Sequence, residues 1–464
     1  MRQRGKNANM DNEYAAFLAR KAPKARPTGV EPQPMPVHLF DFQADVCRFM
    51  VRAGRAAAFL DTGLGKGRMA LECLRQAGDA SGKPTLHLVP LAVARQIETE
   101  GRSLGYEIRL IRCQDEAAAG INVCNYDRID HLDLSRFGAV SLDESHILAS
   151  LTGSTARKLI DGCEPVRFLF CWTATPAPNS HQELGAHAEF LQIMRSTEML
   201  CRWFVNDTNT ASQEWRLKGH AQQAFWDWMA SWSRCAQSPE DLGFDGSQYV
   251  LPPLQTFRHQ AGAEARTMDG TLFGADLTAT TMHAKKRETA TSRAAIAAAL
   301  VNAEPHEPWI LWCDNDAEAD ALMAAVTGAV EVRGSHSPER KERALADFIE
   351  GRKLYLVAKP QACGYGLNLQ HCARVAYVGR SFSYRAWYQS VRRCWRFGQT
   401  RSVHVHLIVA EGEDQIGRVI DRKAGAHAEM KLAMAAAMRR GVATESAVKV
   451  AYLPTHTCEI PSWL

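Results

Sequence analysis

Three features are scarce in this sequence, and each scarcity excludes a class of protein. None of the 13 cysteines stands in a CxxC pair, so we expect neither a disulfide framework nor a structural zinc site, but reduced thiols as in a cytoplasm. No apolar run approaches the length of a membrane span, and the polar N-terminus is not that of a signal peptide, so no membrane partner is expected. The formal net charge is only +4, so any basic surface for a nucleic acid must be local.

What the sequence does contain is a repeated alternation of short apolar runs with helical stretches, beginning at Ala56. The first series of runs reads AAAFLD, TLHLVP, IRLIR, INVCNY, AVSLDE and RFLFCWTA. The second series, from Trp309 onward, reads WILWC, AVEVRG, KLYLVAK, RVAYVG and VHVHLIVA. Apolar runs separated by helices are typical of parallel sheets covered on both faces. The sequence therefore predicts an α/β protein with two parallel-sheet lobes of similar plan.

The 464 residues are enough for two or three domains, and composition divides the chain into five segments. Residues 1–36 mix basic residues with Pro and Gly and are predicted to be a flexible basic arm. Residues 37–193 form the first lobe and residues 304–440 the second. Between them, residues 194–303 are predicted to be a helical, aromatic-rich insert. Residues 441–464 are predicted to be a C-terminal tail, because they have no clear pattern.

One helix of the insert carries an aromatic stripe within HAQQAFWDWMASWSRC. Helical spacing places six residues on one face: Ala221, Ala224, Phe225, Trp228, Met229 and Trp232. This face either packs against a lobe or stacks on nucleic-acid bases. Packing is the favoured interpretation, because large aromatic side chains are usually core residues.

The stretch FLDTGLGKGRM has the features of a phosphate-binding loop. An apolar strand runs into a glycine-rich turn, and a helix is expected to start near Lys66. Such a turn points backbone N–H groups at phosphate oxygens, and Lys66 would reach the β- and γ-phosphates. Gly67 occupies the position where such loops normally carry a Ser or Thr. The alternative is an ordinary strand-to-helix turn with a surface lysine.

An acidic pair, Asp143 and Glu144, ends the apolar run AVSLDESH. At the carboxyl end of a parallel strand, Asp143 would bind Mg²⁺ and Glu144 would orient and deprotonate the attacking water. The alternative is an acidic turn with a solvated Glu144. A phosphate-binding loop upstream in the same sheet favours the catalytic interpretation.

A pair of arginines, Arg393 and Arg396, lies three positions apart in QSVRRCWRFGQ. This spacing predicts that both lie on one face of a helix starting near Tyr384. Phosphoryl transfer is accelerated by arginines that meet the charge on the γ-phosphate, here from the second lobe. The alternative is a basic helix that binds only a phosphate backbone, a role open to the nearby arginines Arg380, Arg385, Arg392 and Arg401.

In chain order these stretches resemble the motifs of the superfamily-two helicases, particularly the Swi/Snf-type DNA translocases in a compact two-lobe form. FDFQ resembles the adenine-recognising segment, DTGLGKG motif I, LVPLAVARQ motif Ia, NYDRI the segment after it, and DESH the DExH form of motif II. WTATPAPN resembles motif III, GYGLNLQ motif V and QSVRRCWRFGQ motif VI. The matches cover residues 38–410. The chain is also similar to motors of bacteriophages and mobile elements, which implies the cytoplasm of a bacterial or phage-infected cell.

The resemblance implies two tandem RecA-like lobes, with ATP and Mg²⁺ between them and nucleic acid across both. The implied catalytic residues are Lys66, Asp143, Glu144, Arg393 and Arg396, with Asp143 also the metal ligand. The implied cofactor-binding residues are Gln43, Thr62, Gly63, Leu64, Gly65, Lys66, Gly67, Arg68 and Gly366. Residues implied to couple hydrolysis to movement are His146, Thr173, Thr175 and Gln389. Residues implied to contact nucleic acid are Pro90, Arg95, Asn125, Lys359, Asn368 and Arg380.

Two residues depart from the family's pattern. Gly67 replaces the magnesium-binding hydroxyl, and Arg392 stands where the Swi/Snf pattern commonly has Asp. Because of Arg392, the geometry of the motif VI helix does not follow from the resemblance.

The expected function is that of an ATP-dependent helicase or translocase that moves on, or remodels, duplex or branched DNA. Three alternatives remain open at this point. One is an RNA helicase, which the form of motif VI disfavours. Another is the motor subunit of a restriction system, although the sequence contains no recognisable nuclease constellation. The third is a nucleotide-gated DNA-binding clamp whose hydrolysis has decayed.

Overall fold

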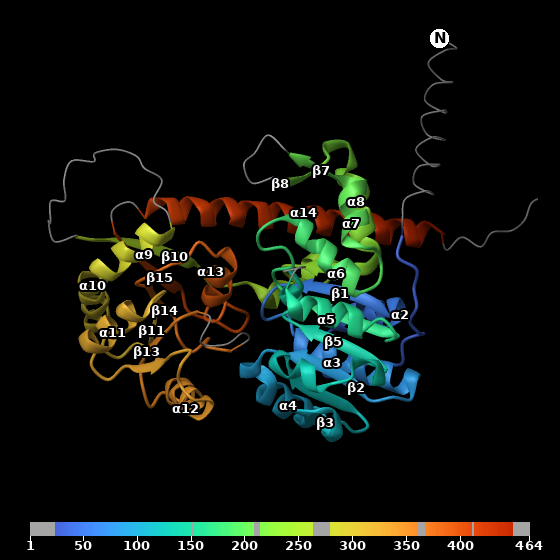
Figure 1. Ribbon diagram of the computed structural model, residues 1–464, viewed down its shortest axis with the longest axis horizontal. Helices are drawn as coiled ribbons and strands as arrows, with labels where there is room; N and C mark the ends of the chain where they lie inside the picture. Colours follow the sequence, from blue (N-terminus) through green and yellow to red (C-terminus); the bar gives the residue numbers. More distant parts are fainter. Residues whose placement is uncertain are drawn as a thin grey trace, which may run out of the picture.

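Two parallel β-sheets form the centres of two α/β lobes (Figure 1). The protein's structure is a computed structural model, which describes residues 24–149, 153–207, 214–262, 279–360, 367–410 and 413–448. The predicted fold class is confirmed: each lobe is a parallel sheet with helices packed against it, as in RecA-like domains. Both series of apolar runs form strands.

The first sheet has the strand order β3-β4-β2-β5-β6-β1-β9. Its strands are β1 (Arg55–Leu60), β2 (Thr85–Val89), β3 (Ile108–Leu110), β4 (Ile121–Asn125), β5 (Ala139–Asp143), β6 (Phe168–Trp172) and β9 (Ser233–Ala236). Both faces are covered, because alternate residues of β1 enter different core clusters. Phe59 packs in one cluster, while Ala58 and Leu60 pack in the other. Every residue of β2 and β6 is buried for the same reason.

The second sheet has the strand order β10-β15-β14-β11-β13-β12. Its strands are β10 (Leu254–Ala261), β11 (Trp309–Trp312), β12 (Val330–Val332), β13 (Tyr355–Ala358), β14 (Arg374–Tyr377) and β15 (Val403–Ala410). The central strand β11 again alternates between two clusters, with Ile310 and Trp312 in one and Trp309 and Leu311 in the other. The carboxyl ends of its parallel strands form one edge of the lobe, where loops carry functional residues in open α/β sheets.

Helices surround the two sheets. The helices that accompany the first sheet are α2 (Asp41–Ala53), α3 (Lys66–Ser81), α4 (Ala94–Ser103), α5 (Ser154–Gly162), α6 (Leu184–Phe190), α7 (Ser196–Trp203) and α8 (Gln222–Trp232). Those that accompany the second are α9 (Ala279–Glu288), α10 (Ala290–Ala303), α11 (Asp316–Ala325), α12 (Pro338–Ile349) and α13 (Tyr384–Val391).

Residues 194–303 contain the expected helices α7, α8, α9 and α10, together with strands that were not predicted. A short antiparallel pair joins β7 (Phe204–Asp207) to β8 (Glu214–Leu217). Strand β9 extends the first sheet beside β1, and β10 extends the second sheet beside β15. These edge strands are difficult to predict, because most residues of β10 are exposed and polar and its apolar pattern is weak.

The aromatic stripe of α8 is buried in the core of the first lobe. Phe225, Trp228, Met229 and Trp232 belong to the same core cluster as residues of the first sheet. Ala224, which was expected on the same face, is exposed. A buried stripe has no free ring face for a nucleic-acid base, so the packing interpretation is correct and the base-stacking interpretation is wrong.

Replacing Trp228 with Ala is expected to lower the free energy of unfolding by about 3–5 kcal/mol, because it removes a buried indole and leaves a cavity. Trp228 is 2% exposed and lies against Trp203 and Trp232. Urea unfolding of the variant measures the loss. Gln223→Ala, on the exposed side of the same helix, is the control and is expected to change the stability little. An unchanged stability in Trp228→Ala would contradict its burial.

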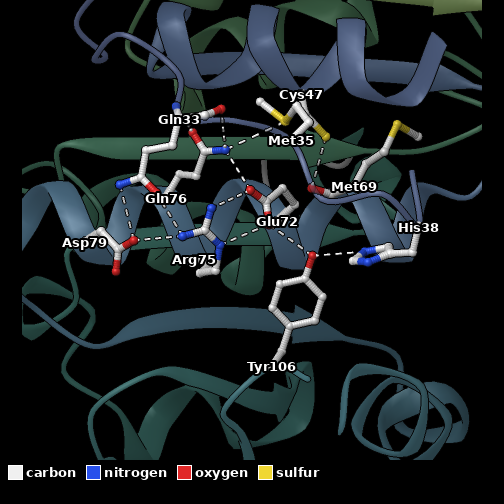
Figure 2. Close-up of polar contacts among 10 residues, drawn as sticks. All are labelled: Gln33, Met35, His38, Cys47, Met69, Glu72, Arg75, Gln76, Asp79 and Tyr106. Carbon is white, nitrogen blue, oxygen red and sulfur yellow. Dashed lines mark hydrogen bonds and ion pairs between the residues drawn. The ribbon is translucent and has the colours of Figure 1, made fainter. Parts of the chain in front are cut away.

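Part of the segment predicted to be a flexible basic arm contacts the first lobe. Residues 1–23 lie outside the described ranges, but Gln33 and Met35 lie against α3 of the first lobe (Figure 2). The Gln33 backbone N–H donates to Oε1 of Gln76 at 2.9 Å. Gln76 in turn donates to the buried Glu72 carboxylate at 2.6 Å, and the Tyr106 hydroxyl donates to the same carboxylate at 3.0 Å. The polar groups of α3 thus bind residues that the sequence reading assigned to a free arm.

The long helix α14 (Asp414–Val448) runs along both lobes (Figure 1). Near its beginning, Ile416 and Ile420 pack against Tyr384 of the second lobe. Farther along, Met434 and Met438 enter the core of the first lobe. The helix continues past residue 440, where the sequence reading began a separate tail. Within the described part of the chain, no helix has both the length and the apolarity to cross a membrane.

Candidate nucleotide-binding and hydrolysis site

The glycine-rich loop, residues 61–65, connects the end of β1 to the start of α3 at Lys66. Gly63 and Gly65 adopt the left-handed backbone conformation, with φ of 89° and 83°, which favours glycine. A side chain at Gly65 would also displace Gln43, because its Cβ would lie 2.2 Å from Nε2 of that side chain, which bonds the loop at Leu64. The loop therefore needs both glycines to turn tightly into the N-terminus of a helix, where anions bind.

The Lys66 amine lies over its own loop. Nζ donates to the carbonyl oxygens of Leu60 at 3.0 Å and Asp61 at 3.1 Å. Burial lowers the pKa of Lys66, although the nearby carboxylates of Glu144 and Asp143 oppose that shift. The amine is thus held beside the helix N-terminus, in position to pair with phosphate oxygens.

The position next to Lys66 has room for a larger residue. A Cβ added at Gly67 would meet no atom within 4 Å. A hydroxyl side chain would therefore fit where phosphate loops normally carry one. Steric crowding therefore does not explain why this position is Gly67.

Asp143 is the group best suited to hold a metal ion. Burial, together with the neighbouring charge of Glu144, raises the pKa of Asp143 to about 7. Asp143 is partly exposed, so an ion could reach it, and a divalent cation would compensate the negative charge that burial and Glu144 disfavour. Oxygen donors from one carboxylate and from phosphates suit Mg²⁺, which readily keeps several waters. The residues present therefore fit a magnesium ion bound with a nucleotide.

Glu144 is held by donors that all converge on its Oε2 atom. His146 Nδ1 lies 3.1 Å away, and the Gln389 amide donates at 3.2 Å from the other lobe. The Thr173 hydroxyl lies 3.4 Å away and also accepts from the backbone N–H of Thr175 at 3.1 Å. The four residues expected to couple hydrolysis to movement thus form one hydrogen-bonded group around the acidic residue.

The backbone and the charge of Glu144 are both unusual. Its φ of 49° lies in the left-handed region, which is rare for a residue with a side chain and often occurs at functional sites. Burial alone would raise the pKa of Glu144. The His146 hydrogen bond and the charges of Lys66 and Arg393 outweigh burial, so the pKa is lowered. Glu144 is therefore held as a carboxylate that can accept a proton.

The charges of Arg393 and Arg396, from the second lobe, act on the acidic and basic groups of the first lobe, but the two arginines do not lie on a helix. The prediction that Arg393 and Arg396 share a helix face is wrong, because α13 ends at Val391 and both lie in the turns that follow. The charge of Arg393 contributes to the lowered pKa of Glu144, and that of Arg396 to the lowered pKa of Lys66. The pKa of Arg396 is itself lowered, mainly by burial and in addition by the positive charge of Arg393. In the described ranges, its buried Nε has no hydrogen-bond partner.

The remaining residues expected to bind the cofactor each make different contacts. Gln43 is buried, and its amide donates to the Leu64 carbonyl at 3.0 Å, so it supports the glycine-rich loop. Arg68 Nε lies 2.7 Å from Glu100. Thr62 has a buried hydroxyl without a partner in the ranges that the structure covers. Gly366 lies outside the described residues, and contact of Gln43 with adenine stays a prediction.

The residues expected to contact nucleic acid lie mostly at the carboxyl ends of strands. Pro90 follows β2 and Asn125 ends β4, while Lys359 follows β13 and Asn368 is exposed. Arg380 shares a pocket with Lys359, and its guanidinium lies 5.3 Å from the Trp387 ring centre.

Arg95 connects the two lobes at the surface. Its side chain is 77% exposed and lies 3.7 Å from Glu342 of α12. Arg95 is thus exposed, whereas Lys359 and Arg380 of the second lobe are partly buried, and no described contact tests their binding to nucleic acid.

Two interlobe contacts were not predicted from the sequence. Asp61 forms a buried ion pair with Arg392, and Lys431 of α14 lies 3.6 Å from the same carboxylate. Tyr249 stacks on Phe397 with ring centres 4.3 Å apart. The unusual Arg392 was a usable signal for the first contact, whereas Lys431 lies outside every motif and carried none.

Comparison with known proteins adds little to this geometry. No family model matches the chain, and no curated protein sequence matches it. Among solved structures, the chain is similar to the SWI2/SNF2 ATPase core of Sulfolobus solfataricus in complex with dsDNA. That similarity has 13% sequence identity and a TM-score of 0.40, and it covers 93% of this chain and 99% of the other. Because both values are low, assignment of the fold rests on the two parallel sheets themselves.

Proposed function

We propose that this protein is a nucleic-acid-dependent ATPase, and more specifically a DNA translocase of the Swi/Snf type. In this proposal it hydrolyses ATP between its lobes and couples hydrolysis to movement on, or remodelling of, duplex or branched DNA. The observation that carries the proposal is the convergence on Glu144. Donors from both lobes hold one oxygen of this carboxylate, beside a lysine at a glycine-rich loop.

The division of labour follows from the chemistry of each side chain. Lys66 and the backbone amides of the glycine-rich loop bind the phosphates. Asp143 would hold Mg²⁺, which supplies charge neutralisation on the β- and γ-phosphates. Glu144 orients the attacking water and accepts its proton. Arg393 and Arg396 stabilise the charge that develops on the γ-phosphate.

Coupling of hydrolysis to movement follows from the fact that the catalytic side chains belong to different lobes. Glu144 and Lys66 belong to the first lobe, whereas Gln389 and the two arginines belong to the second. Hydrolysis therefore requires that the lobes close on the nucleotide, and product release permits them to open. A nucleic acid bound across both lobes would be moved by this cycle.

DNA is favoured over RNA by the resemblance of QSVRRCWRFGQ to motif VI of Swi/Snf-type translocases. Exposed or pocket-lining cations in both lobes, Arg95, Lys359 and Arg380, are suited to a phosphate backbone. The clamp alternative is disfavoured by the ordered surroundings of Glu144, because a protein that no longer hydrolyses ATP does not need them.

ATP hydrolysis measured with duplex, forked and single-stranded DNA and with RNA tests the proposal. Duplex or forked DNA is expected to stimulate phosphate release most. Stimulation by RNA alone would indicate an RNA helicase. DNA binding without hydrolysis at any magnesium concentration would indicate the clamp.

Gly67→Thr is expected to lower the Mg²⁺ concentration needed for half-maximal turnover and to change the maximal rate little. The added hydroxyl supplies one oxygen ligand where the wild type relies on water, and the space for it is open. Titration of magnesium at saturating ATP and DNA measures the shift, and Gly67→Val adds bulk without the ligand oxygen. An inert wild type whose turnover Gly67→Thr restores would contradict the proposed ATPase.

A further inference from the structure

The Asp61 carboxylate, at the start of the glycine-rich loop, is bound by parts of the chain that lie far apart in sequence. Asp61 is 1% exposed. Its oxygens accept from Arg392 and from the Tyr388 hydroxyl, both in the second lobe. Lys431 of α14 lies 3.6 Å away, and the Thr62 backbone N–H donates at 2.7 Å. One carboxylate therefore joins the nucleotide-binding loop to the second lobe and to the C-terminal helix.

The charges in this cluster are mutually stabilised. Burial would raise the pKa of Asp61, but the charges of Lys431 and Arg392 and the Tyr388 hydrogen bond lower it well below its usual range. Asp61 in turn raises the pKa of Lys431 against the effect of burial. Removal of one partner from such a cluster leaves an incompletely compensated buried charge, which is strongly unfavourable.

Two of the partners move with different lobes. Lys431 lies on the part of α14 that packs with the first lobe, because its neighbours Met430 and Met434 belong to that lobe's core. Arg392 follows α13 of the second lobe. If the lobes separate, Arg392 and Tyr388 leave Asp61, and Lys431 loses its own 3.3 Å contact with the Tyr388 hydroxyl. The Asp61–Arg392 contact therefore forms only when the lobes are together.

Asp61 and Arg392 are each bonded to a segment that carries a proposed catalytic residue. The backbone carbonyl of Asp61 accepts from Lys66 Nζ at 3.1 Å. The Arg392 guanidinium also donates to the Trp395 carbonyl at 3.3 Å, which ties down the turn that carries Arg393. A shift of Arg392 would therefore disturb the arginine turn, and a shift of Asp61 would disturb the loop that holds Lys66.

We propose that Asp61 and Arg392 form an interlobe latch, a pair of positioning residues that sets the glycine-rich loop and the arginine turn in register when the lobes close. This inference rests on the proposed function for its effect on turnover. The latch itself is a property of lobe closure and is measurable without ATP. Neither side chain of the pair needs to touch the reacting atoms.

Kinetics of four variants test the latch: Arg392→Gln, Arg392→Lys, Asp61→Asn and the double variant Asp61→Asn/Arg392→Gln. Arg392→Gln is expected to lower kcat with saturating DNA about tenfold, as coupled network residues do. The Kd for a fluorescent ADP analogue, set mainly by the first lobe, is expected to change less than about twofold, on the scale of independent sites. Arg392→Lys is expected to recover part of kcat. The double variant is expected to turn over no more slowly than the slower single variant.

Arg374→Gln is the matched control. Arg374 is also a largely buried arginine of the second lobe, paired with Glu304 at 2.5 Å, but its partner lies within the same lobe. It is expected to keep the wild-type kcat. Equal losses of kcat in Arg374→Gln and Arg392→Gln would mean that any damaged ion pair slows the enzyme, and would overturn the latch.

Small-angle scattering without nucleotide separates failure of the latch from failure of the proposed function. Arg392→Gln and Asp61→Asn are expected to have a larger radius of gyration than the wild type and Arg374→Gln. If the wild type hydrolyses no ATP but these two variants still open, the latch stands and the ATPase proposal falls. If the wild type is active and Arg392→Gln matches it in both kcat and radius of gyration, the latch falls. Multiplicative losses in the double variant would also overturn it.

Discussion

Arg396→Ala is expected to cut ATP turnover by about 10³-fold or more, as loss of an arginine finger does, while ATP binding stays nearly intact. Arg396 is a mostly buried cation beside Lys66, and its Nε lacks a hydrogen-bond partner in the described ranges. Burying a cation in this way is costly unless an anion completes the site. The γ-phosphate is that anion in the proposed function. Single-turnover hydrolysis with saturating DNA, together with a nucleotide-binding titration, measures the two effects separately.

The same loss is expected for Arg393→Ala, whose charge contributes to the lowered pKa of Glu144. Lys at either position keeps the charge but loses the planar fork, so Arg396→Lys is expected to recover only part of the rate. Arg374→Gln again serves as the control outside the site. A variant that loses DNA binding but keeps its DNA-independent ATPase activity would contradict the assignment of that arginine to the γ-phosphate.

Glu144→Gln is expected to lower turnover by about 10²- to 10⁴-fold, the usual contribution of a general base. The amide oxygen of Gln still accepts from Gln389 and Thr173, so the lobes are expected to close normally. Only the ability to accept the water's proton is lost. The variant should therefore accumulate as an ATP-bound complex on DNA. Co-retention of ATP and duplex DNA during gel filtration measures this complex.

The matched control for this variant is Glu164→Gln, an exposed glutamate of the same lobe, which is expected to keep full turnover. Turnover by Glu144→Gln at the rate of the control would show that Glu144 is not the base. Rapid turnover accompanied by weak DNA binding would instead indicate a role for Glu144 in lobe closure alone.

The predictions that succeeded from sequence are those set by local chemistry. The strands were predictable because both faces of each sheet are covered, which makes the central strands continuous apolar runs. The start of α3 at Lys66 was predictable because a glycine-rich turn follows β1 directly. Burial of the α8 stripe was predictable because large aromatic side chains gain most from leaving water.

The predictions that failed depend on contacts between distant parts of the chain. α13 ends at Val391, and the turn that follows it carries Arg392, which contacts Asp61 in the other lobe. No helical period in one segment contains that information. Strand β10 was missed because it lies at a sheet edge and exposes polar residues. The contact of Gln33 with α3 depends on Gln76 and its buried neighbours, which the local composition does not reveal.

Arg392 is recognisable in the sequence as unusual, but its role depends on interlobe contacts that the sequence does not show. Its partner, Asp61, lies in a motif more than three hundred residues away. Lys431, the other cation near Asp61, lies in a helix without recognisable motifs. Only the folded chain brings the three together.

Displacement of a third strand from duplex DNA tests directly whether the protein translocates along the duplex. A labelled oligonucleotide bound as a triplex at one end of a long duplex is released only when a motor moves along the duplex into it. We expect release that requires ATP hydrolysis, occurs with the wild type, and is absent with Glu144→Gln and with a non-hydrolysable ATP analogue. Vigorous DNA-stimulated ATP hydrolysis without release of the third strand would contradict translocation along duplex DNA.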